Sequence, residues 1–300
     1  MNWDEQIRMY YNKESIIYLD GEWVKAVEAK IDLFSQTLHY GSGVFEGIRA
    51  YDSSVGPNVF KAKEHYERLL YSADKMGINM TYSVNELVNL TYELLDRNSI
   101  SDAYIRPLVF LGANMKLAKT FDTHLMIAAW EWEPYSGEDP LRVMVSSFER
   151  PNPKSVPIDA KISGHYINSI LATNEAKRLG YDEALLLDSN GYVAEGPGAN
   201  FFFVKDGIIY TPALGNILPG ITRATIIEYA MELGYPVVEK FFTFDEIRGA
   251  ETAFFVGTAT EIASISSIND IKFEKDWKET IAYELFLMYR QRVNSNHVVL

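Results

Sequence analysis

Hydrophobic residues along the first half of the chain recur with the periods of both strands and helices. Residues 16–19 and 23–27 flank a short polar turn and predict a β-hairpin. The apolar side chains of residues 63–76 recur three and four positions apart, which predicts a helix. Two long apolar runs, residues 103–111 and 124–132, predict strands. This mixture of strands and helices indicates an α+β fold.

Capping residues mark where further helices begin and end. Ser83 is a good N-cap and Glu86 follows three positions later, so a capping box is expected at the start of a helix over 84–97. A helix over 167–178 is expected to end at Gly180. Further helices are predicted over 223–233 and 245–249, and strands over 142–147, 183–188, 192–196, 200–204, 208–211, 236–242, 252–257 and 261–265.

A polar segment near the middle of the chain marks a domain boundary. Residues 133–140 read EPYSGEDP and are rich in turn formers and acidic groups. The chain of 300 residues is long enough for one large domain or two medium-sized ones. We therefore expect a smaller N-terminal α+β domain over 1–132, an interdomain loop over 133–145 and a larger C-terminal domain over 146–300, which would carry Lys161.

Composition excludes several classes of function. The net charge of −13 argues against a general surface for nucleic acid or anionic membrane. The chain has no cysteine, and its five histidines are scattered, so we expect no metal site. The N-terminus lacks the features of a signal peptide, and no run approaches the roughly 20 apolar residues that span a bilayer. A cytoplasmic protein without nucleic-acid or membrane partners is expected.

Lys161 is the first residue with candidate chemistry. Small and apolar residues surround it in the run DAKISGHYINSILA, and Gly164 allows another group to approach closely. A lysine removed from water can serve as an amine nucleophile. Because a lone lysine is more often a solvated surface group, this assignment depends on companion residues.

Glu195 is the first companion of Lys161. A carboxylate beside a catalytic lysine can hold the nitrogen of a pyridine ring protonated, which makes the ring an electron sink. Glu195 stands on a predicted strand in GYVAEGPGANFFF. Gly196 and Gly198 follow it, and glycines weaken a plain strand and suggest the close approach of a flat ligand. The alternative is an exposed strand residue.

Three further segments have features of a phosphate site. Residues 220–222 (GIT) stand at a predicted helix start, where free N–H groups bind anions, although an ordinary N-cap is common there. The turn 257–260 (GTAT) exposes backbone N–H groups, although a plain hairpin is the commoner explanation. Arg68 in HYERLL is able to grip a phosphate through two bonds, or else is a solvated helix charge.

Taken together and in this order, these segments resemble the fold-type IV pyridoxal-phosphate enzymes, and among them the branched-chain amino-acid aminotransferases. The resemblance covers nearly the whole chain. It implies two sheet-containing domains with pyridoxal 5′-phosphate between them, and an active site near the interface of a homodimer or larger homo-oligomer. The segments that carry it are HYGSGVFEGIRAY (39–51), HYERL (65–69), AYIRPLVF (103–110), AKISGHYINSILA (160–172), GYDEALLLD (180–188), GYVAEGPGANFF (191–202), LPGITR (218–223) and FFVGTATEI (254–262).

The resemblance implies a role for each matching position. Lys161 would carry the cofactor as a Schiff base and move the proton during catalysis. Glu195 would face the pyridine nitrogen, and Tyr166 would hydrogen-bond the phenolic oxygen. The residues implied to bind the phosphate are Arg68, Ile221, Thr222 and Thr258. The residues implied to bind substrate are Tyr40, Phe45, Tyr104, Arg106, Trp132, Tyr135 and Ala259.

The implied reaction is the reversible transamination of L-leucine, L-isoleucine and L-valine with 2-oxoglutarate, giving branched 2-oxo acids and L-glutamate. Aromatic walls bury a branched side chain, which contributes about 25 cal/mol per Å². Arg106 would pair with the side-chain carboxylate of glutamate, so that one pocket accepts both substrates. Ordinary core packing remains the alternative for Trp132 and Tyr135.

Other functions stay open within and beyond this resemblance. A D-amino-acid aminotransferase or an aminodeoxychorismate lyase is the alternative within the same fold, and a non-catalytic pyridoxal-phosphate-binding protein is the alternative outside enzymes. The chain also departs from its relatives in two places. Pro197 and Ala199 replace residues of the common EGSGEN or EGAGEN run, which puts the hydrogen bonds near the ring in doubt. Residues 112–120 lack the usual Gly/Pro-rich run, which puts the edge of the active site in doubt.

Overall fold

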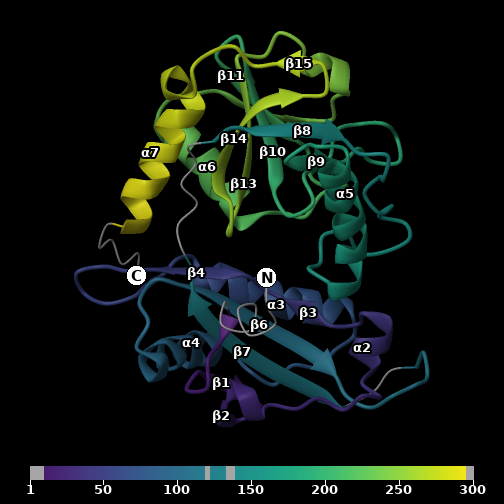
Figure 1. Cartoon of the computed structure of the whole chain (residues 1–300), viewed down its shortest axis with the longest axis vertical. Coiled ribbons are helices and arrows are strands. Elements are labelled where there is room, and N and C mark those ends of the chain that lie inside the picture. The colour runs from purple at the N-terminus through teal and green to yellow at the C-terminus, as the bar shows by residue number, and fades with distance from the viewer. Residues whose placement is uncertain (1–9, 119–121, 133–138, 295–300) are drawn as a thin grey trace. The chain divides into compact units, whose positions relative to one another are not determined.

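The computed structural model describes residues 10–118, 122–132 and 139–294. The chain divides into two compact units. Unit 1 contains Met1–Pro134, Ala160–Gly164 and Val293–Leu300, and unit 2 contains Tyr135–Asp159 and His165–Arg292. Each unit has its own sheet and helices (Figure 1). Residues 133–138 of the expected interdomain loop lie outside the described residues.

The described strands of unit 1 form an antiparallel sheet. The strand order is β2-β1-β7-β6-β4-β5, and β3 pairs with β6. Pairing of Ala103 with Glu131 and of Leu111 with Thr123 confirms the two predicted long strands, and β1 and β2 confirm the hairpin. The strands are β1 Ile16–Leu19, β2 Glu22–Lys25, β3 Val44–Phe45, β4 Ile48–Tyr51, β5 Asn58–Val59, β6 Ala103–Leu111 and β7 Thr123–Glu131.

Two helices of unit 1 bury an apolar face in one cluster with the sheet. Helix α3 spans Ala62–Lys75 and helix α4 spans Val84–Asn98, close to the predicted bounds. Tyr66 and Leu69 of α3 and Leu94 of α4 are completely buried in this cluster. Burial of each such side chain contributes about 1.5–3 kcal/mol, so this face fixes how α3 lies on its sheet.

Local hydrogen bonds fix the helix ends of unit 1. The predicted capping box is confirmed, because the Ser83 hydroxyl accepts from the Glu86 N–H and the Ser83 N–H donates to Glu86 Oε2 at 2.7 Å. The short helix α2, Gln36–Tyr40, begins after Ser35, whose hydroxyl accepts from the helix. It ends at Gly41, which has φ of 68°, a left-handed conformation that glycine adopts without strain.

Unit 2 contains a mixed sheet of order β12-β11-β10-β13-β14-β8-β9, with β15 paired to β14. The pairs β11–β12, β14–β8 and β8–β9 are parallel, and the other described pairs are antiparallel. Strand β8 occupies the last part of the segment expected to be the interdomain loop. The strands are β8 Leu141–Val145, β9 Glu183–Leu185, β10 Asn200–Lys205, β11 Ile208–Pro212, β12 Val237–Lys240, β13 Thr252–Gly257, β14 Glu261–Ile268 and β15 Ile271–Lys272.

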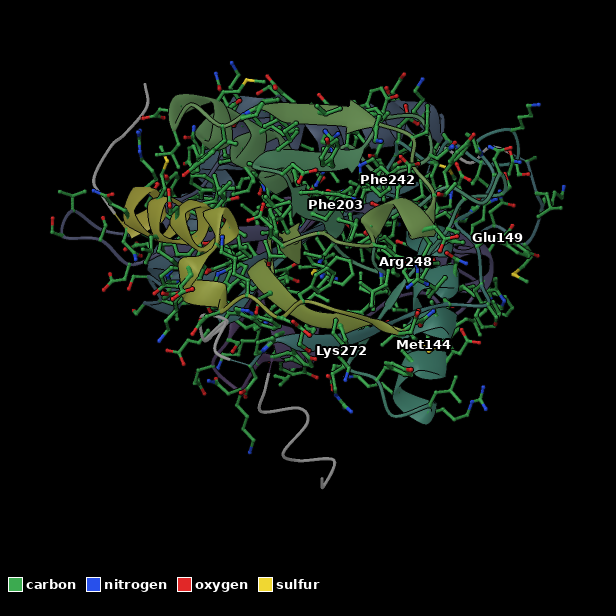
Figure 2. The ribbon with its side chains drawn as sticks, turned by 90° about the horizontal axis from the view of Figure 1, so that it is seen from above. Met144, Glu149, Phe203, Phe242, Arg248 and Lys272 are labelled. Carbon is green, nitrogen blue, oxygen red and sulfur yellow. The ribbon has the colours of Figure 1, made fainter. Side chains whose placement is uncertain are left out.

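Phenylalanine rings cover both faces of strand β10. Phe201 and Phe203 point to one face, where the ring of Phe203 lies 5.0 Å from that of Phe242 at a steep angle (Figure 2). On the other face Phe202 stacks on Phe254, with ring centroids 5.2 Å apart. Aromatic pairs of this kind add roughly 0.5–1.5 kcal/mol beyond burial alone. Strand β10, which follows the turn after Glu195, is therefore rigidly held.

The described part of the second half of the chain contains three long helices. Helix α5 spans Tyr166–Arg178 and helix α6 spans Ile221–Glu232, as predicted within two residues. Helix α7, Ile281–Asn294, has no counterpart among the predicted elements. Among the described residues, no helix is long and apolar enough to cross a membrane, and no group of acidic or histidine side chains could hold a metal ion.

The predicted strand over 192–196 is wrong. Its residues form only isolated bridges, one of which pairs Glu195 with Asn200. The chain reverses between these two residues, where the Gly196 N–H donates to the Ala199 carbonyl at 2.8 Å. A segment that turns back on itself after so few residues cannot continue as a ladder strand, so Glu195 stands at the start of a tight turn.

Candidate active site

Lys161 belongs to unit 1 and not to the C-terminal unit in which its place in the sequence had put it, because the backbone of unit 1 holds it. The Lys161 N–H donates to the Ser72 hydroxyl at 2.9 Å, and its carbonyl accepts from the Phe45 N–H at 3.1 Å. The neighbouring residues Ala160 and Ile162 are buried, and Lys161 itself is half-buried. Its side chain therefore extends from a fixed point, which a nucleophilic amine needs.

The segment after Lys161 packs directly on another stretch of backbone. The Gly164 N–H donates to the Gly41 carbonyl at 2.9 Å. A Cβ on Gly164 would stand 3.1 Å from that carbonyl oxygen, and a Cβ on Gly41 would stand 2.8 Å from Gly164 Cα. The close approach predicted at Gly164 is thus confirmed, and the group that approaches is the backbone of Gly41.

Phe45 is a common platform for two cationic side chains. The Lys161 Nζ lies 5.1 Å from the centre of the Phe45 ring, and the Arg106 guanidinium carbon lies 4.8 Å from it. Arg106 also lies 5.5 Å from the ring of Tyr104. Cations at such distances from an aromatic face are attracted by its quadrupole. The structure therefore brings the predicted lysine, arginine and two of the predicted aromatic residues together within unit 1.

Tyr104 is fixed from two sides. Its ring lies 5.2 Å from that of Trp132, and a Cβ on Gly47 would collide with its hydroxyl. Tyr40 is more open, with 46% of its surface exposed, and its hydroxyl donates to the Met115 carbonyl at 3.2 Å. Tyr135 lies outside the described residues. Of the aromatic residues predicted to bind substrate, Phe45, Tyr104 and Trp132 thus form one group in unit 1.

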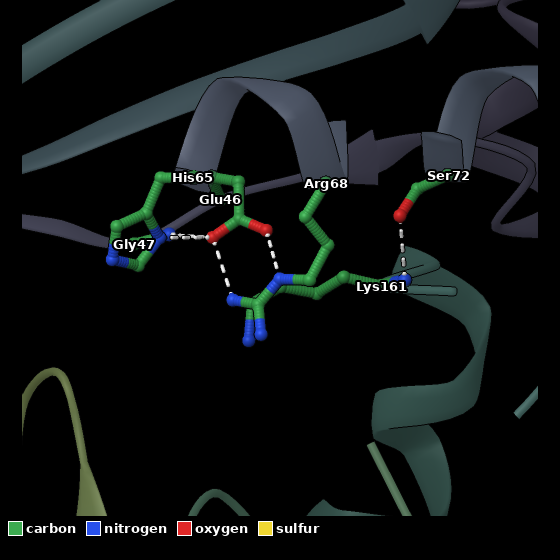
Figure 3. Close-up of polar contacts among 6 residues, drawn as sticks. All are labelled: Glu46, Gly47, His65, Arg68, Ser72 and Lys161. Atoms are coloured by element: carbon green, nitrogen blue, oxygen red, sulfur yellow. Dashed lines mark hydrogen bonds and ion pairs between the residues drawn. The ribbon is translucent and has the colours of Figure 1, made fainter. Parts of the chain in front are cut away.

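Arg68 is anchored by a buried carboxylate (Figure 3). Its Nε donates to Glu46 Oε1 at 2.6 Å and its Nη2 donates to Glu46 Oε2 at 2.9 Å, a two-bond fork. His65 Nδ1 lies 2.8 Å from the same Oε2. The Glu46 side chain is completely buried, and only 11% of the Arg68 side chain is exposed. Arg68 is therefore an oriented group and not the solvated helix charge that the sequence left open.

Electrostatics fix the charges in this cluster. Burial alone would raise the pKa of Glu46, but the charge and hydrogen bonds of Arg68, with the bond from His65, hold the pKa well below its usual value. Burial lowers the pKa of His65, although Glu46 opposes this, and the charges of Arg68 and Lys161 lower it further. Glu46 is therefore ionised and His65 neutral near pH 7, so His65 donates from Nδ1.

Glu195 has a comparable anchor in unit 2. Arg150 Nη2 lies 2.8 Å from Glu195 Oε1, and the side chains of both residues are less than 10% exposed. Asn200 Nδ2 donates to Glu195 Oε2 at 2.9 Å, and the Leu218 N–H donates to Oε1 at 3.1 Å. Glu195 is buried and oriented, which is the opposite of the exposed strand residue considered as an alternative.

Asn200 connects Glu195 to the start of helix α6. Asn200 Nδ2 also donates to the Leu218 carbonyl at 3.0 Å, and a Cβ on Gly220 would collide with Asn200 Oδ1. Helix α6 begins at Ile221, so the N–H groups of Ile221 and its neighbour Thr222 belong to the first turn, where the backbone has no partner within the helix. The predicted helix start at 220–222 is confirmed, and Thr222 is buried.

The turn over 257–260 lies against the same region of unit 2. Strand β13 ends at Gly257 and β14 begins at Glu261, so the predicted turn is confirmed. A Cβ on Gly257 would stand 3.2 Å from the Gly198 carbonyl. No heavy atom would lie within 4 Å of a Cβ on Gly198, whereas a Cβ on Gly196 would stand 2.9 Å from the Phe255 ring. The glycine that leaves room for a ligand is therefore Gly198, and Gly196 accommodates a core ring.

Tyr166 begins helix α5 in unit 2 and is half-buried. The residue before it, His165, has a lowered pKa because it is partly buried and because Arg150 carries a positive charge nearby. Tyr166, Glu195, Thr222 and Thr258 thus all belong to unit 2.

Comparison with known proteins gives the family. The model of the family described as amino-transferase class IV matches residues 43–268, which is most of the chain. This chain belongs to the class IV aminotransferases. It is 44% identical to the branched-chain-amino-acid aminotransferase of Pseudomonas aeruginosa over 267 residues, which is 87% of each chain.

Solved structures of branched-chain amino acid aminotransferases have the same fold. That of the Escherichia coli branched-chain amino acid aminotransferase matches with a TM-score of 0.90 and 36% identity, over 96% of this chain and 98% of the other. The branched-chain amino acid aminotransferase from Thermobaculum terrenum, solved in its PLP form, matches with a TM-score of 0.88 and 32% identity, over 94% of each chain. The predicted fold-type IV architecture with two sheet-containing units is confirmed.

Sequence reasoning missed several residues of this site. Glu46 and His65 stand inside the segments that carry the resemblance, but no role was predicted for either. Asn200 likewise stands in the matching run after Glu195. Arg150 lies in a proline-rich segment whose local pattern only excludes regular structure. The signal for Glu46 and Arg150 is tertiary, since each contacts a predicted site residue, Arg68 or Glu195, from a distant segment. His65 acts on Arg68 only through Glu46, and Asn200 contacts Glu195 across the tight turn that follows it.

Proposed function

We propose that this chain is a branched-chain amino-acid aminotransferase that transfers the amino group of L-leucine, L-isoleucine or L-valine to 2-oxoglutarate, with pyridoxal 5′-phosphate as cofactor. The names of its relatives support this function over a D-amino-acid aminotransferase or an aminodeoxychorismate lyase. The observation that carries the proposal is the position of Lys161 and Arg106 over the same Phe45 ring. An amine nucleophile and a carboxylate-binding group thereby share one apolar wall.

The side chains present have the chemistry that pyridoxal 5′-phosphate requires. Lys161 supplies the primary amine, and Arg68 supplies donors of the kind that bind a phosphate. In unit 2 the first turn of α6, at Ile221 and Thr222, supplies backbone donors of the same kind. Thr258 adds donors from the turn after β13. The buried carboxylate of Glu195 matches a protonated ring nitrogen, and Tyr166 supplies a hydroxyl for the phenolic oxygen.

Each of these side chains has one task in the reaction. When bound, the cofactor supplies an electron sink for the electrons of the broken Cα–H bond. The amine of Lys161 would take the proton from the substrate Cα and move it to C4′ of the cofactor. Glu195 keeps the proton on the ring nitrogen, and Arg150 and Asn200 hold Glu195 in place for it.

Substrate selection follows from the aromatic group of unit 1. Phe45, Tyr104 and Trp132 offer apolar surface to a branched side chain, and Arg106 pairs with the second carboxylate of glutamate. Tyr40 adds to this wall. The resemblance to the family implies that Tyr104, and also Ala259 in the 257–260 turn, contact the α-carboxylate. One pocket thus serves both halves of the reaction.

The test combines spectroscopy with a panel of amino donors. The purified protein should be yellow, and its visible band should move when L-leucine is added. With 2-oxoglutarate as acceptor, branched-chain donors should give the highest turnover. Lys161→Ala should abolish turnover, whereas Lys177→Ala, which changes an exposed lysine of α5, should leave it unchanged. Full turnover in the Lys161→Ala variant would contradict the proposal.

Two features remain predictions. Self-association into a homodimer or larger assembly comes from the resemblance alone, and size-exclusion chromatography with light scattering would test it. A cytoplasmic location comes from the sequence alone, and cell fractionation would test it.

A further inference from the structure

Glu46 is a buried carboxylate that the proposed reaction does not use. It lies between β3 and β4 of unit 1, and its side chain has no exposed surface. Its two oxygens accept hydrogen bonds from Arg68 Nε and Nη2, from His65 Nδ1 and from the Gly47 N–H. Every partner of this carboxylate is thus a donor at a defined position.

Stability alone does not explain such a pair. Removing a carboxylate and a guanidinium from water is costly, and buried ion pairs are often no more stabilising than apolar side chains of similar volume. The charges of Arg68 and Lys161 both lower the pKa of His65, so the two side chains lie in the same neighbourhood. The pair with Glu46 therefore fixes a guanidinium near the reactive lysine. A group that is oriented at this cost is expected to have a function that depends on its orientation.

The geometry of the fork determines which edge of Arg68 is presented. Nε and Nη2 both face Glu46, so the edge that carries Nη1 faces away from the carboxylate (Figure 3). His65 holds Glu46 Oε2 from the other side. The guanidinium therefore cannot rotate without breaking two charge-assisted hydrogen bonds.

We propose that Glu46 is a positioning residue that fixes the Arg68 guanidinium for the phosphate group of the cofactor, with His65 holding the carboxylate in turn. This inference rests on the proposed function, in which Arg68 binds the phosphate. Because Glu46 neutralises the charge of Arg68, phosphate recognition depends on the direction of the guanidinium donors more than on excess positive charge.

The variant Glu46→Gln tests this role. Glutamine keeps the shape of the side chain but turns one acceptor into a donor, so the two-bond fork to Arg68 is lost. The cofactor-free full-length chain should bind pyridoxal 5′-phosphate about 10- to 100-fold more weakly, which is the loss typical of removing a residue that orients a metal ligand. Its affinity for pyridoxal, which has no phosphate, should be unchanged.

Asp102→Asn is the matched control. Asp102 pairs at 2.8 Å with Arg49, whose side chain is 1% exposed, so this change also removes the carboxylate from a buried arginine of unit 1. Arg49 has no proposed role toward the phosphate. Asp102→Asn should therefore leave the ratio of the two affinities as in the wild type, which separates orientation of Arg68 from loss of a carboxylate partner of a buried arginine in general.

His65 gives a second test that leaves the Glu46–Arg68 pair intact. Asparagine can place a donor near the position of Nδ1, whereas leucine cannot. His65→Leu should weaken binding of pyridoxal 5′-phosphate but not of pyridoxal, and His65→Asn should restore most of it. If Glu46→Gln does not give folded protein, the two His65 variants test the positioning role of Glu46 in its place.

The outcomes distinguish the two proposals. A wild-type chain that binds neither compound refutes the proposed function. A wild-type chain that binds pyridoxal 5′-phosphate, together with a Glu46→Gln variant that keeps its affinity or loses both affinities equally, refutes the positioning role. A selective loss for the phosphorylated compound in Glu46→Gln and His65→Leu supports it.

Discussion

Replacing Arg150 by methionine is expected to destabilise the protein through the charge that it leaves behind. Arg150 pairs with Glu195 at 2.8 Å, and their side chains are only 8% and 6% exposed. Methionine fills a similar volume but carries no charge, so the carboxylate of Glu195 stays buried without its cation. The perturbation therefore acts on an electrostatic balance and leaves packing nearly intact.

The expected magnitude follows from the remaining partners of Glu195. Removing one member of a buried ion pair costs about 3–5 kcal/mol. Glu195 keeps the hydrogen bonds from Asn200 Nδ2 at 2.9 Å and from the Leu218 N–H at 3.1 Å, so we expect the lower end, about 3 kcal/mol. At about 2–4 °C per kcal/mol, the Tm should fall by about 6–12 °C.

Thermal unfolding of the cofactor-free chain, followed by circular dichroism, measures this effect without any contribution from ligand. Arg248→Met is the matched control in unit 2. Arg248 pairs with Asp270 at 2.8 Å, but the two side chains are 49% and 66% exposed, and Arg248 stands at the surface (Figure 2). Exposed pairs contribute little, so its Tm should stay at the wild-type value.

A second variant shows whether the buried charge is the cause. Combining Arg150→Met with Glu195→Gln removes both charges, so most of the lost stability should return. If Arg150→Met melts at the wild-type temperature, or if the double variant is less stable than Arg150→Met alone, the electrostatic explanation is wrong.

The remaining predictions concern substrate choice, the α6 start and pH. Arg106→Met should raise KM for glutamate far more than KM for leucine in steady-state assays, because only glutamate has a second carboxylate, and equal losses would contradict this role. Gly220→Ala should cost about 1–3 kcal/mol in denaturant unfolding and weaken cofactor binding, because the added Cβ collides with Asn200, and a variant as stable as the wild type would show that the loop yields easily. Partial burial lowers the pKa of His124, but hydrogen bonds and charge from Asp20 and Asp122 outweigh it and raise the pKa above 6.5. This stabilisation is complete below pH 6.5 and is lost as the pH rises through the higher folded-state pKa, so His124→Gln should flatten the fall in Tm above neutral pH, and parallel pH profiles would refute the effect.

Elements with local signals could be predicted from the sequence. Helix α4 was found from Ser83 and Glu86, which form their hydrogen bonds within the element itself. Strands β6 and β7 were found because nine-residue segments that are mostly apolar are long enough to show strand character without their partners. Predicted features that depend on neighbouring residues in the chain, such as the turn at 257–260, are likewise observed.

Elements and contacts that depend on distant residues could not be predicted in this way. The segment 192–196 has the composition of a strand, but its carboxylate is held by Arg150 and by the α6 start, and the chain turns back after it. The Glu46–Arg68 fork joins a strand end to the middle of a helix. Neither position carries a pattern that specifies its partner.

Helix α7 could have been found. Ala282, Leu285, Tyr289 and Val293 are buried and recur three and four positions apart, which is the spacing of one helix face. The preceding Thr280 also offers a helix start, since its hydroxyl accepts from the Tyr283 N–H at 3.3 Å. The physical signal was present in the sequence, so this omission does not reflect a tertiary effect.

The segment Ala160–Gly164 makes the two units inseparable as gene fragments. The chain passes between units four times, and this segment returns to unit 1 from within the sequence of unit 2. There Ile162 bridges to Val44, and the Ser163 N–H donates to the Gly43 carbonyl at 2.8 Å. A fragment cut near residue 132 would lack both the lysine and a piece of its own fold. If recombination exchanged the first 132 residues with those of a relative, the segment that carries Lys161 would have to pack on residues from another protein. The two halves of the chain are therefore expected to be inherited together.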